Sequence, residues 1–265
     1  MNKSVKQIIN SKFNAKVIYI LCMRWEGKKL KSSIEDLQKR GFATENHIKK
    51  LSDISQMQLM DLLHSECATE RTAAAHNLFS SNENTAMELL KQLSVEKCLY
   101  TKIAICESLE KGNIDTAKQM VNYLGKIGNN HHRELPNKVS EKKSFPLPRD
   151  IIARSLGKMN TIVFPVLLEV LNGNDICKIS EVLDSIGFMV FYNPVLSTIE
   201  NATFIFNLEH NYAENELILW KMLLCLSAFP LNETKAILSS YLCFNNLLGK
   251  EAQRSLWILK NRRGI

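Results

Sequence analysis

Signals for β-structure, membrane spans and disulfide bonds are scarce in this 265-residue sequence. Its ten glycines and six prolines are few, and no turn dipeptide stands between two runs of alternating apolar residues, which argues against β-hairpins. No stretch approaches the roughly 18–20 apolar residues that a membrane helix needs. Seven cysteines are scattered without a C-x-x-C pair, which favours reduced, buried thiols. We therefore expect a cytoplasmic protein built from helices, with no membrane segment.

Catalytic and metal-binding motifs are missing as well. The sequence contains no glycine-rich phosphate loop, no H-E-x-x-H and no G-x-S-x-G. His131 and His132 form its only histidine cluster, in a polar stretch where a solvated loop is the expected structure. These absences predict that the protein is not an enzyme and holds no cofactor and no metal.

Positive charge gathers in the first 64 residues, which carry twelve Lys and Arg against six Asp and Glu, within a net charge of +7 for the chain. A basic segment either solvates helix faces or meets nucleic acid, an acidic protein or anionic lipid. The residues that would contact nucleic acid are the lysines and the arginine that follow the first apolar run: Lys28, Lys29, Lys31, Lys39, Arg40, Lys49 and Lys50.

A repeated helical phrase is the strongest pattern that is present. Residues 71–78 (RTAAAHNL) are echoed by 102–109 (KIAICESL) and by 149–157 (RDIIARSLG). Each copy begins with a cation, continues with small or aliphatic residues, and places an apolar residue at its eighth position. Self-similarity at about thirty to fifty residues is typical of stacked helical hairpins, none of which buries its apolar face alone.

The same periodicity predicts the helices and divides the chain in two. A basic helical segment covers 1–64, with helices near 13–24, 31–40 and 44–50 and one starting after Ser52 or Asp53, and a repeat array covers 65–265. Gly41 and Thr44 supply a helix stop and a helix cap. The hairpins of the array are expected at 66–80 with 84–93, 95–110 with 114–127, 149–159 with 162–171, 175–191 with 194–208, and 214–229 with 233–244, before a capping helix at 251–262.

Two features stand out within the array. Residues 130–148 are polar and contain three prolines, which predicts an exposed loop insertion. Residues 162–171, which follow a cap at Thr161 and include Pro165 in the first turn, are apolar nearly all round. That composition predicts a central, buried helix.

These phrases resemble HEAT repeats, particularly the short bacterial variety related to those of phycobilin lyases. Residues 148–171 resemble the family pattern most clearly, since an Arg-led helix ends in Leu-Gly and a second helix opens with a proline. The resemblance implies an all-α fold, an α-solenoid of HEAT-like hairpins whose second helices line a concave face. It also implies that Arg71, Lys102, Arg149 and Asp150 are structural, bridging neighbouring repeats.

The function that follows is a non-catalytic scaffold or adaptor that receives a protein partner on the concave face. Polar positions expected to be exposed on the second helices are Glu88, Lys91, Gln92, Lys118, Gln119 and Asn122. The alternative is nucleic-acid binding through the basic segment. A further alternative is a DNA glycosylase similar to the HEAT-like alkylpurine enzymes, which line a cleft with aromatic, acidic and basic side chains.

Overall fold

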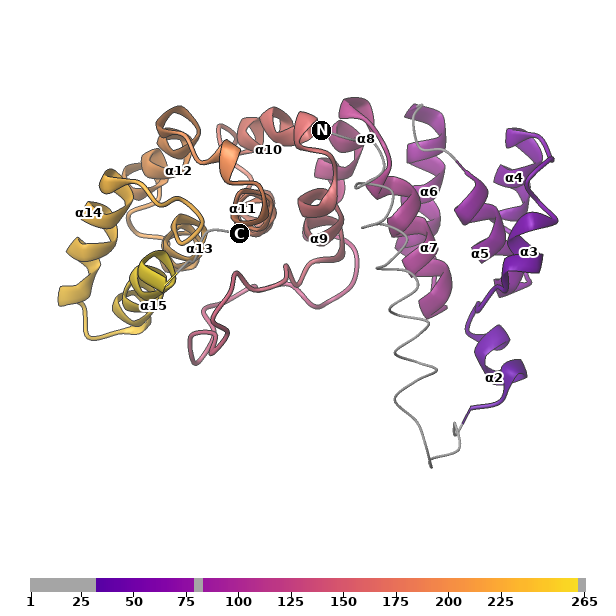
Figure 1. Ribbon diagram of the computed structural model, residues 1–265, viewed down its shortest axis with the longest axis horizontal. Helices are drawn as coiled ribbons and strands as arrows, with labels where there is room; N and C mark the ends of the chain where they lie inside the picture. The colour runs from indigo at the N-terminus through magenta and orange to yellow at the C-terminus, as the bar shows by residue number, and fades with distance from the viewer. Residues whose placement is uncertain (1–31, 79–82, 262–265) are drawn as a thin grey trace. The chain divides into compact units, whose positions relative to one another are not determined.

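The computed structural model describes residues 32–78 and 83–261, and every regular element within these ranges is a helix (Figure 1). The expected all-α class is therefore confirmed. The contacts divide the chain between Leu37 and Gln38, so 38–64 group with the helices that follow them. This boundary differs from the one that composition suggested at 64/65.

The α-helices are α2 (Ile34–Lys39), α3 (Glu45–Lys49), α4 (Gln56–Leu62), α5 (Ala68–Asn77), α6 (Glu83–Val95), α7 (Leu99–Glu110), α8 (Ile114–Met120), α9 (Ile151–Lys158), α10 (Phe164–Val170), α11 (Ile176–Tyr192), α12 (Ile199–Asn211), α13 (Glu216–Leu226), α14 (Asn232–Ser240) and α15 (Leu247–Asn261). Short 3-10 turns η1 (Val121–Tyr123), η2 (Thr161–Val163), η3 (Pro194–Leu196) and η4 (Tyr241–Cys243) join some of them. The helix expected near 13–24 lies outside the described residues.

Capping side chains and a glycine set the ends of the short helices before α5. Thr44 caps α3 and exchanges hydrogen bonds with His47, as the sequence predicted for this position. Gly41 adopts φ +90°, and a methyl group there would lie 2.6 Å from Thr101 Oγ1, so glycine is required for both conformation and space. The cap of α4 is Ser55; the expectation of Ser52 or Asp53 was wrong, because 50–54 form turns instead.

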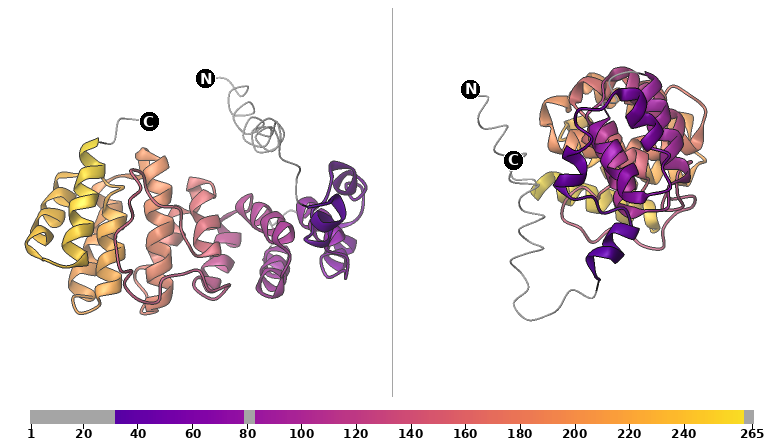
Figure 2. Two further views of the ribbon diagram at one scale, coloured as in Figure 1. Left: turned by 90° about the horizontal axis from the view of Figure 1, so that it is seen from below. Right: turned by 90° about the vertical axis from the view of Figure 1, so that its right-hand side faces the viewer.

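Alternate helices of the array pack in two sets. The first helices α5, α7, α9, α11, α13 and α15 each pack against the next member of that row. The second helices α6, α8, α10, α12 and α14 each pack against a first helix, and α6, α8 and α10 also contact in sequence. Figure 1 shows α8, α10 and α12 above the row formed by α9, α11 and α13, and Figure 2 shows the helices following one another in chain order from indigo to yellow.

Buried serines tie consecutive first helices together. Ser108 Oγ of α7 donates to the carbonyl of Leu78 at the end of α5, at 2.6 Å. Ser185 Oγ of α11 donates to Ala153 of α9, and Ser255 Oγ of α15 to Leu223 of α13, both at 2.9 Å. A small hydroxyl side chain lets two backbones approach while it satisfies a buried carbonyl.

The third hairpin departs from its prediction in two details. Asn160, not Thr161, supplies the capping oxygen, which accepts from Ile162 N–H at 3.0 Å. Ile162 itself is 60 % exposed, because 161–163 form a 3-10 turn before α10 starts at Phe164. Pro165 does lie in the first turn of α10, where its missing N–H is tolerated.

The most deeply buried helices are α11 and α13, whose apolar side chains fill the centre of the core. Within the described ranges no single helix is both long and apolar enough to cross a membrane. The pair α9 and η2–α10 reaches that length together, but it is bent by 115°.

The cysteines only partly follow the expectation of buried thiols. Cys106 and Cys225 are buried, whereas Cys67, Cys177 and Cys243 are exposed. Cys98 is half-buried at the N-cap of α7 and is not a core residue. The remaining cysteine, Cys22, lies outside the described residues.

Candidate functional site

The connection between η1 and α9 contains no helix, as predicted for 130–148, but it is not a free loop. Residues 130–149, here called the strap, run past the first helices toward α13 and α15 (Figure 1). Arg254 of α15 holds the strap by donating from Nη2 to the carbonyl oxygens of Lys142 and Ser144, at 3.0 and 3.1 Å. These two bonds hold the backbone of the strap against α15.

Phe145 fixes the strap more firmly still. Its ring is 2 % exposed and lies 6.0 Å from that of Phe191, centroid to centroid. A methyl group at Gly187 would come within 2.2 Å of Phe145 Cζ, so α11 leaves a space for this ring that only glycine provides. The expectation that the whole segment is exposed was therefore wrong at its aromatic anchor.

Charged side chains are buried beneath the strap. Lys221 of α13 is fully buried, and its Nζ lies 2.5 Å from Asp184 Oδ2 and 3.5 Å from Glu181 Oε1, both on α11. Burial and the neighbouring Asp184 raise the pKa of Glu181, Lys221 opposes them, and the net result is a pKa of about 7. Two carboxylates thus compete for one ammonium, and Glu181 Oε2 has no hydrogen-bond partner among the described residues.

Trp220 is held beside this cluster by a second buried pair. Its Nε1 donates to Glu251 Oε2 at 3.0 Å, and Arg254 Nη1 donates to Glu251 Oε1 at 2.8 Å. Burial raises the pKa of Glu251, against the opposing effect of Arg254 and Trp220. The same arginine therefore orients the indole and clamps the strap.

His132 of the strap packs edge-on against Trp220, with ring centroids 4.9 Å apart. Burial, together with the charges of Lys221 and Arg149, lowers the pKa of His132 to about 4. Arg149 Nη1 lies 3.0 Å from His132 Nε2, and an arginine only donates, so Nε2 accepts and the imidazole is neutral. His132 is therefore fixed in position and uncharged.

A cavity of about 610 Å³ opens between the strap and the first helices. Trp220, Leu224 and Asp184 form its helical side. The strap contributes the remaining lining residues: His132, Pro136, Lys138, Val139, Ser140, Glu141, Lys142, Pro146, Leu147 and Arg149. Its size and its mixture of apolar walls with a few charged groups are typical of a binding site.

The charges around the cavity do not cancel. Lys138 pairs with Glu141 at 2.9 Å, and Asp184 is matched by Lys221. Lys142 and Arg149 form no ion pair with a carboxylate among the described residues. The mouth of the cavity is therefore positively charged.

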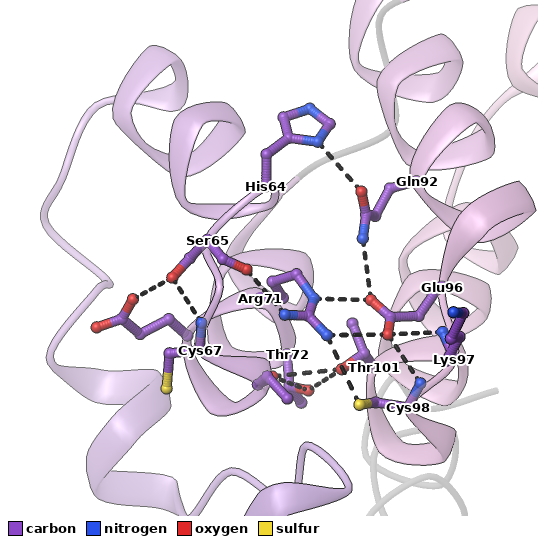
Figure 3. Close-up of polar contacts among 12 residues, drawn as sticks. His64, Ser65, Cys67, Arg71, Thr72, Gln92, Glu96, Lys97, Cys98 and Thr101 are labelled. Carbon is purple, nitrogen blue, oxygen red and sulfur yellow. Dashed lines mark hydrogen bonds and ion pairs between the residues drawn. The ribbon is translucent and has the colours of Figure 1, made fainter.

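The six predicted partner-binding residues lie elsewhere, on α6 and around α8. Glu88 pairs with Lys91 at 2.8 Å, and His64 Nε2 lies 3.5 Å from the same carboxylate. Gln92 is 8 % exposed, so its predicted exposure was wrong. Its amide bridges His64 and Glu96 inside the network that Figure 3 shows, which makes Gln92 a packing residue.

The three predicted residues around α8 lie at its surface and at the turn that follows. Lys118 is exposed and pairs with Asp115 at 3.8 Å. Asn122 is exposed and accepts from Lys178 of α11 at 3.3 Å, and Gln119 is half-buried. The structure does not bring them together with the cavity.

The predicted nucleic-acid residues are described only in part. Lys39, Arg40, Lys49 and Lys50 are exposed, and Lys49 makes a solvated pair with Glu45 at 3.7 Å. Lys28, Lys29 and Lys31 lie outside the described residues.

Arg71 and Asp150 both make contacts that hold segments of the chain together. Arg71 donates to both carboxylate oxygens of Glu96, at 2.8 and 3.0 Å, and so joins α5 to the end of α6 (Figure 3). Asp150 caps α9 and accepts from Gly125 N–H at 3.3 Å. Arg149 differs, because it binds Asn130 and His132 within the strap. Lys102 forms no ion pair within the described ranges.

No group of three or more histidine, cysteine, aspartate or glutamate side chains in the described part of the chain could hold a metal ion. Comparison with known proteins adds no relative: no family model, curated protein or solved structure matches this sequence.

Sequence reasoning overlooked the buried charges, although they leave a signal. Lys221 interrupts an otherwise apolar run, 217–226 (LILWKMLLCL). Glu181 and Asp184 are three residues apart, which puts both on one face of a helix. A lysine inside a buried helix requires a carboxylate nearby, so these two segments could have been paired.

Proposed function

We propose that the chain is an α-solenoid of HEAT-like hairpins. The continuous row of first helices supports this, because each helix packs on the equivalent helix of the next hairpin. The recurring serine ties support it too, since Ser108, Ser155, Ser185 and Ser255 all precede Leu or Ile in a first helix. We take the cytoplasm as its compartment, where the six described cysteines, all free, would stay reduced.

We propose further that this array is a non-catalytic scaffold that binds an extended segment of a partner protein. The observation that carries this proposal is the strap itself. A stretch of polypeptide without helix is already bound on the first helices through an aromatic anchor, Phe145, and through Arg254, which donates to two of its backbone carbonyls. The cavity lies beside this stretch and offers a second site, in which Leu147 is 41 % exposed and Trp220 and Leu224 line the helical side with little exposed area.

The proposed surface differs from the second-helix face that the sequence favoured. The cavity is lined by α11, α13 and the strap, whereas the predicted residues belong to α6 and the surroundings of α8. We therefore assign partner binding to the side of the first helices.

A catalytic role has less support than binding. Perturbed acids beside a cavity are candidates for proton transfer. However, Lys221 and Glu181 are each 0 % exposed, so a substrate in the cavity does not reach either group. Asp184 does line the cavity, but its carboxylate is committed to Lys221 at 2.5 Å. These groups hold α11 against α13.

A display selection tests the proposal. Random peptides of about twelve residues, long enough to span the cavity when extended, would be selected on the full chain. Leu147 lines the cavity and is 41 % exposed, so Leu147→Lys alters the site without entering the core. Leu242, which is 49 % exposed and does not line the cavity, gives the matched control Leu242→Lys.

Enriched peptides should bind the original chain and Leu242→Lys equally, and should bind Leu147→Lys about tenfold more weakly, as expected for an anchor contact. Peptides that bind all three chains with one affinity would contradict the proposed site.

Nucleic-acid binding is the second candidate, and the exposed cations Lys39, Arg40, Lys49 and Lys50 favour it. Such binding would weaken steeply as salt is raised, whereas docking on an apolar anchor would persist. A DNA glycosylase of the kind considered above needs aromatic, acidic and basic residues in its cleft, and the cavity has Trp220, Asp184 and Arg149. However, Trp220 is only 4 % exposed beside the strap, which leaves a flipped base little aromatic surface on which to stack.

A further inference from the structure

The cavity mouth carries two positive charges that the protein itself does not neutralise. Arg149 is held in place by Asn130 and His132, at 3.1 and 3.0 Å, and neither partner carries a charge. Lys142 has its backbone fixed by Arg254, and its side chain is exposed. The Arg149 guanidinium is therefore positioned in advance, and the exposed Lys142 ammonium lies on a chain segment that is fixed; both are available to an anion.

The nearby acidic groups do not cancel this surplus. Asp184 is neutralised by Lys221 and Glu141 by Lys138. Glu181 is sealed in the core and forms no part of the lining. An incoming carboxylate thus meets a positive potential at the mouth, which both steers its approach and selects against basic partners.

The other lining residues of the cavity are mostly apolar. Trp220 and Leu224 present apolar surface from α13, and Pro136, Pro146 and Leu147 continue it across the strap. An aromatic side chain placed there would pack mainly against Leu147, which is 41 % exposed, and the neighbouring prolines, because Trp220 is only 4 % exposed and His132 already packs edge-on against it at 4.9 Å. Apolar depth and a cationic rim together define the occupant.

We propose that the partner segment, given the binding function above, is an acidic stretch with an aromatic anchor: one aromatic side chain enters the cavity beside Leu147, and flanking carboxylates pair with Arg149 and Lys142. The strap already makes a contact of this kind with the first helices. Phe145 shows that the first helices accept a phenylalanine ring next to an extended backbone.

The test uses the full chain and three fluorescein-labelled synthetic peptides, measured by fluorescence anisotropy at low and high salt. Each peptide has a central phenylalanine, flanked by glutamates, by serines or by lysines. Lys142→Glu reverses a charge at the cavity, and Lys143→Glu makes the same change at the neighbouring exposed lysine, which does not line the cavity. The two variants share one net charge.

The glutamate-flanked peptide should bind at least tenfold more tightly than the lysine-flanked one, and this preference should shrink at high salt. Lys142→Glu should reduce its affinity about tenfold, while Lys143→Glu should leave it within about twofold, because a screened charge outside the site contributes little.

Two results overturn the inference in different ways. If all three peptides bind alike and Leu147→Lys still weakens them, the acidic preference is wrong and the scaffold function stands. If no peptide binds, or if binding ignores both Lys142→Glu and Leu147→Lys, the proposed site fails together with the inference.

Discussion

Two buried ion-pair clusters join helices of this chain, and they differ in how completely their carboxylates are hydrogen-bonded. In the first half, Glu96 receives both guanidinium bonds of Arg71, two backbone N–H bonds from Lys97 and Cys98, and the amide of Gln92. Burial opposes its ionisation, but these donors hold the pKa of Glu96 at about 2. Every oxygen is satisfied, so this cluster only fixes structure.

In the second half, Lys221 serves two carboxylates, Asp184 at 2.5 Å and Glu181 at 3.5 Å, and it does not satisfy Glu181 fully. Glu181 retains an oxygen without a partner among the described residues, and its pKa rises to about 7. The contrast shows that a buried ion pair does not by itself mark a site. The cluster that is under-satisfied is also the one that borders a cavity.

Removing the shared cation should produce the largest effect. Lys221→Met leaves Asp184 and Glu181 buried without compensation, and should lower the free energy of unfolding by about 3–5 kcal/mol. Denaturant titration followed by circular dichroism measures it.

The matched rescue is Lys221→Met combined with Glu181→Gln and Asp184→Asn, which removes the uncompensated charges. It should recover at least half of the loss. A triple variant as unstable as the single one would show that Lys221 acts through packing.

Arg71→Met tests the satisfied cluster and should cost about 2–3 kcal/mol, because Glu96 loses its charged hydrogen-bond partner. Lys102→Met is the control: it occupies the corresponding place in the next phrase, without an ion pair, and should stay within about 0.5 kcal/mol. Equal effects at the two positions would remove the distinction between them.

The strap lies only in the second region, and substitutions at two glycines test how it is held there. Gly187→Ala drives a methyl group into Phe145 and should cost about 1–2 kcal/mol, with faster cleavage of the strap in limited proteolysis. Gly157→Ala, where the nearest atom lies at 3.1 Å, should change stability less and leave cleavage unchanged. Identical cleavage of both variants would show that Phe145 does not hold the strap.

The pH dependence of stability should separate the two clusters by the direction of its slope. Glu181 has a folded pKa above its ordinary value, so its contribution is present below about pH 4.5 and lost as the pH rises toward 7. Glu96 has a depressed pKa, so its contribution is present above about pH 4.5 and lost as the pH falls toward 2.

Glu181→Gln should therefore flatten the stability profile between about pH 4.5 and 7, and Glu96→Gln should flatten it below about pH 4.5, each by no more than about 1.4 kcal/mol per pH unit. Parallel profiles for the two variants would contradict the contrast between the clusters.

Much of the helical order was predictable because repeated phrases carry the apolar period of each hairpin. Helix ends were less predictable than the helices themselves. Asn160 and Ser55 are the caps in place of neighbouring polar residues, because capping depends on local turn geometry that periodicity does not encode. The charge cluster needed tertiary information, since Lys221 lies some forty residues from Glu181. The burial of Phe145 depends on the space left at Gly187, and nothing in the sequence pattern pairs these two residues.

Hydrogen exchange on the full chain, with and without a saturating selected peptide, tests most directly whether partners dock on the first helices. The account predicts protection at 136–147 and at 220–224, with α6 and α8 unchanged. Protection confined to α6 and α8 would return the binding surface to the second helices and contradict the account.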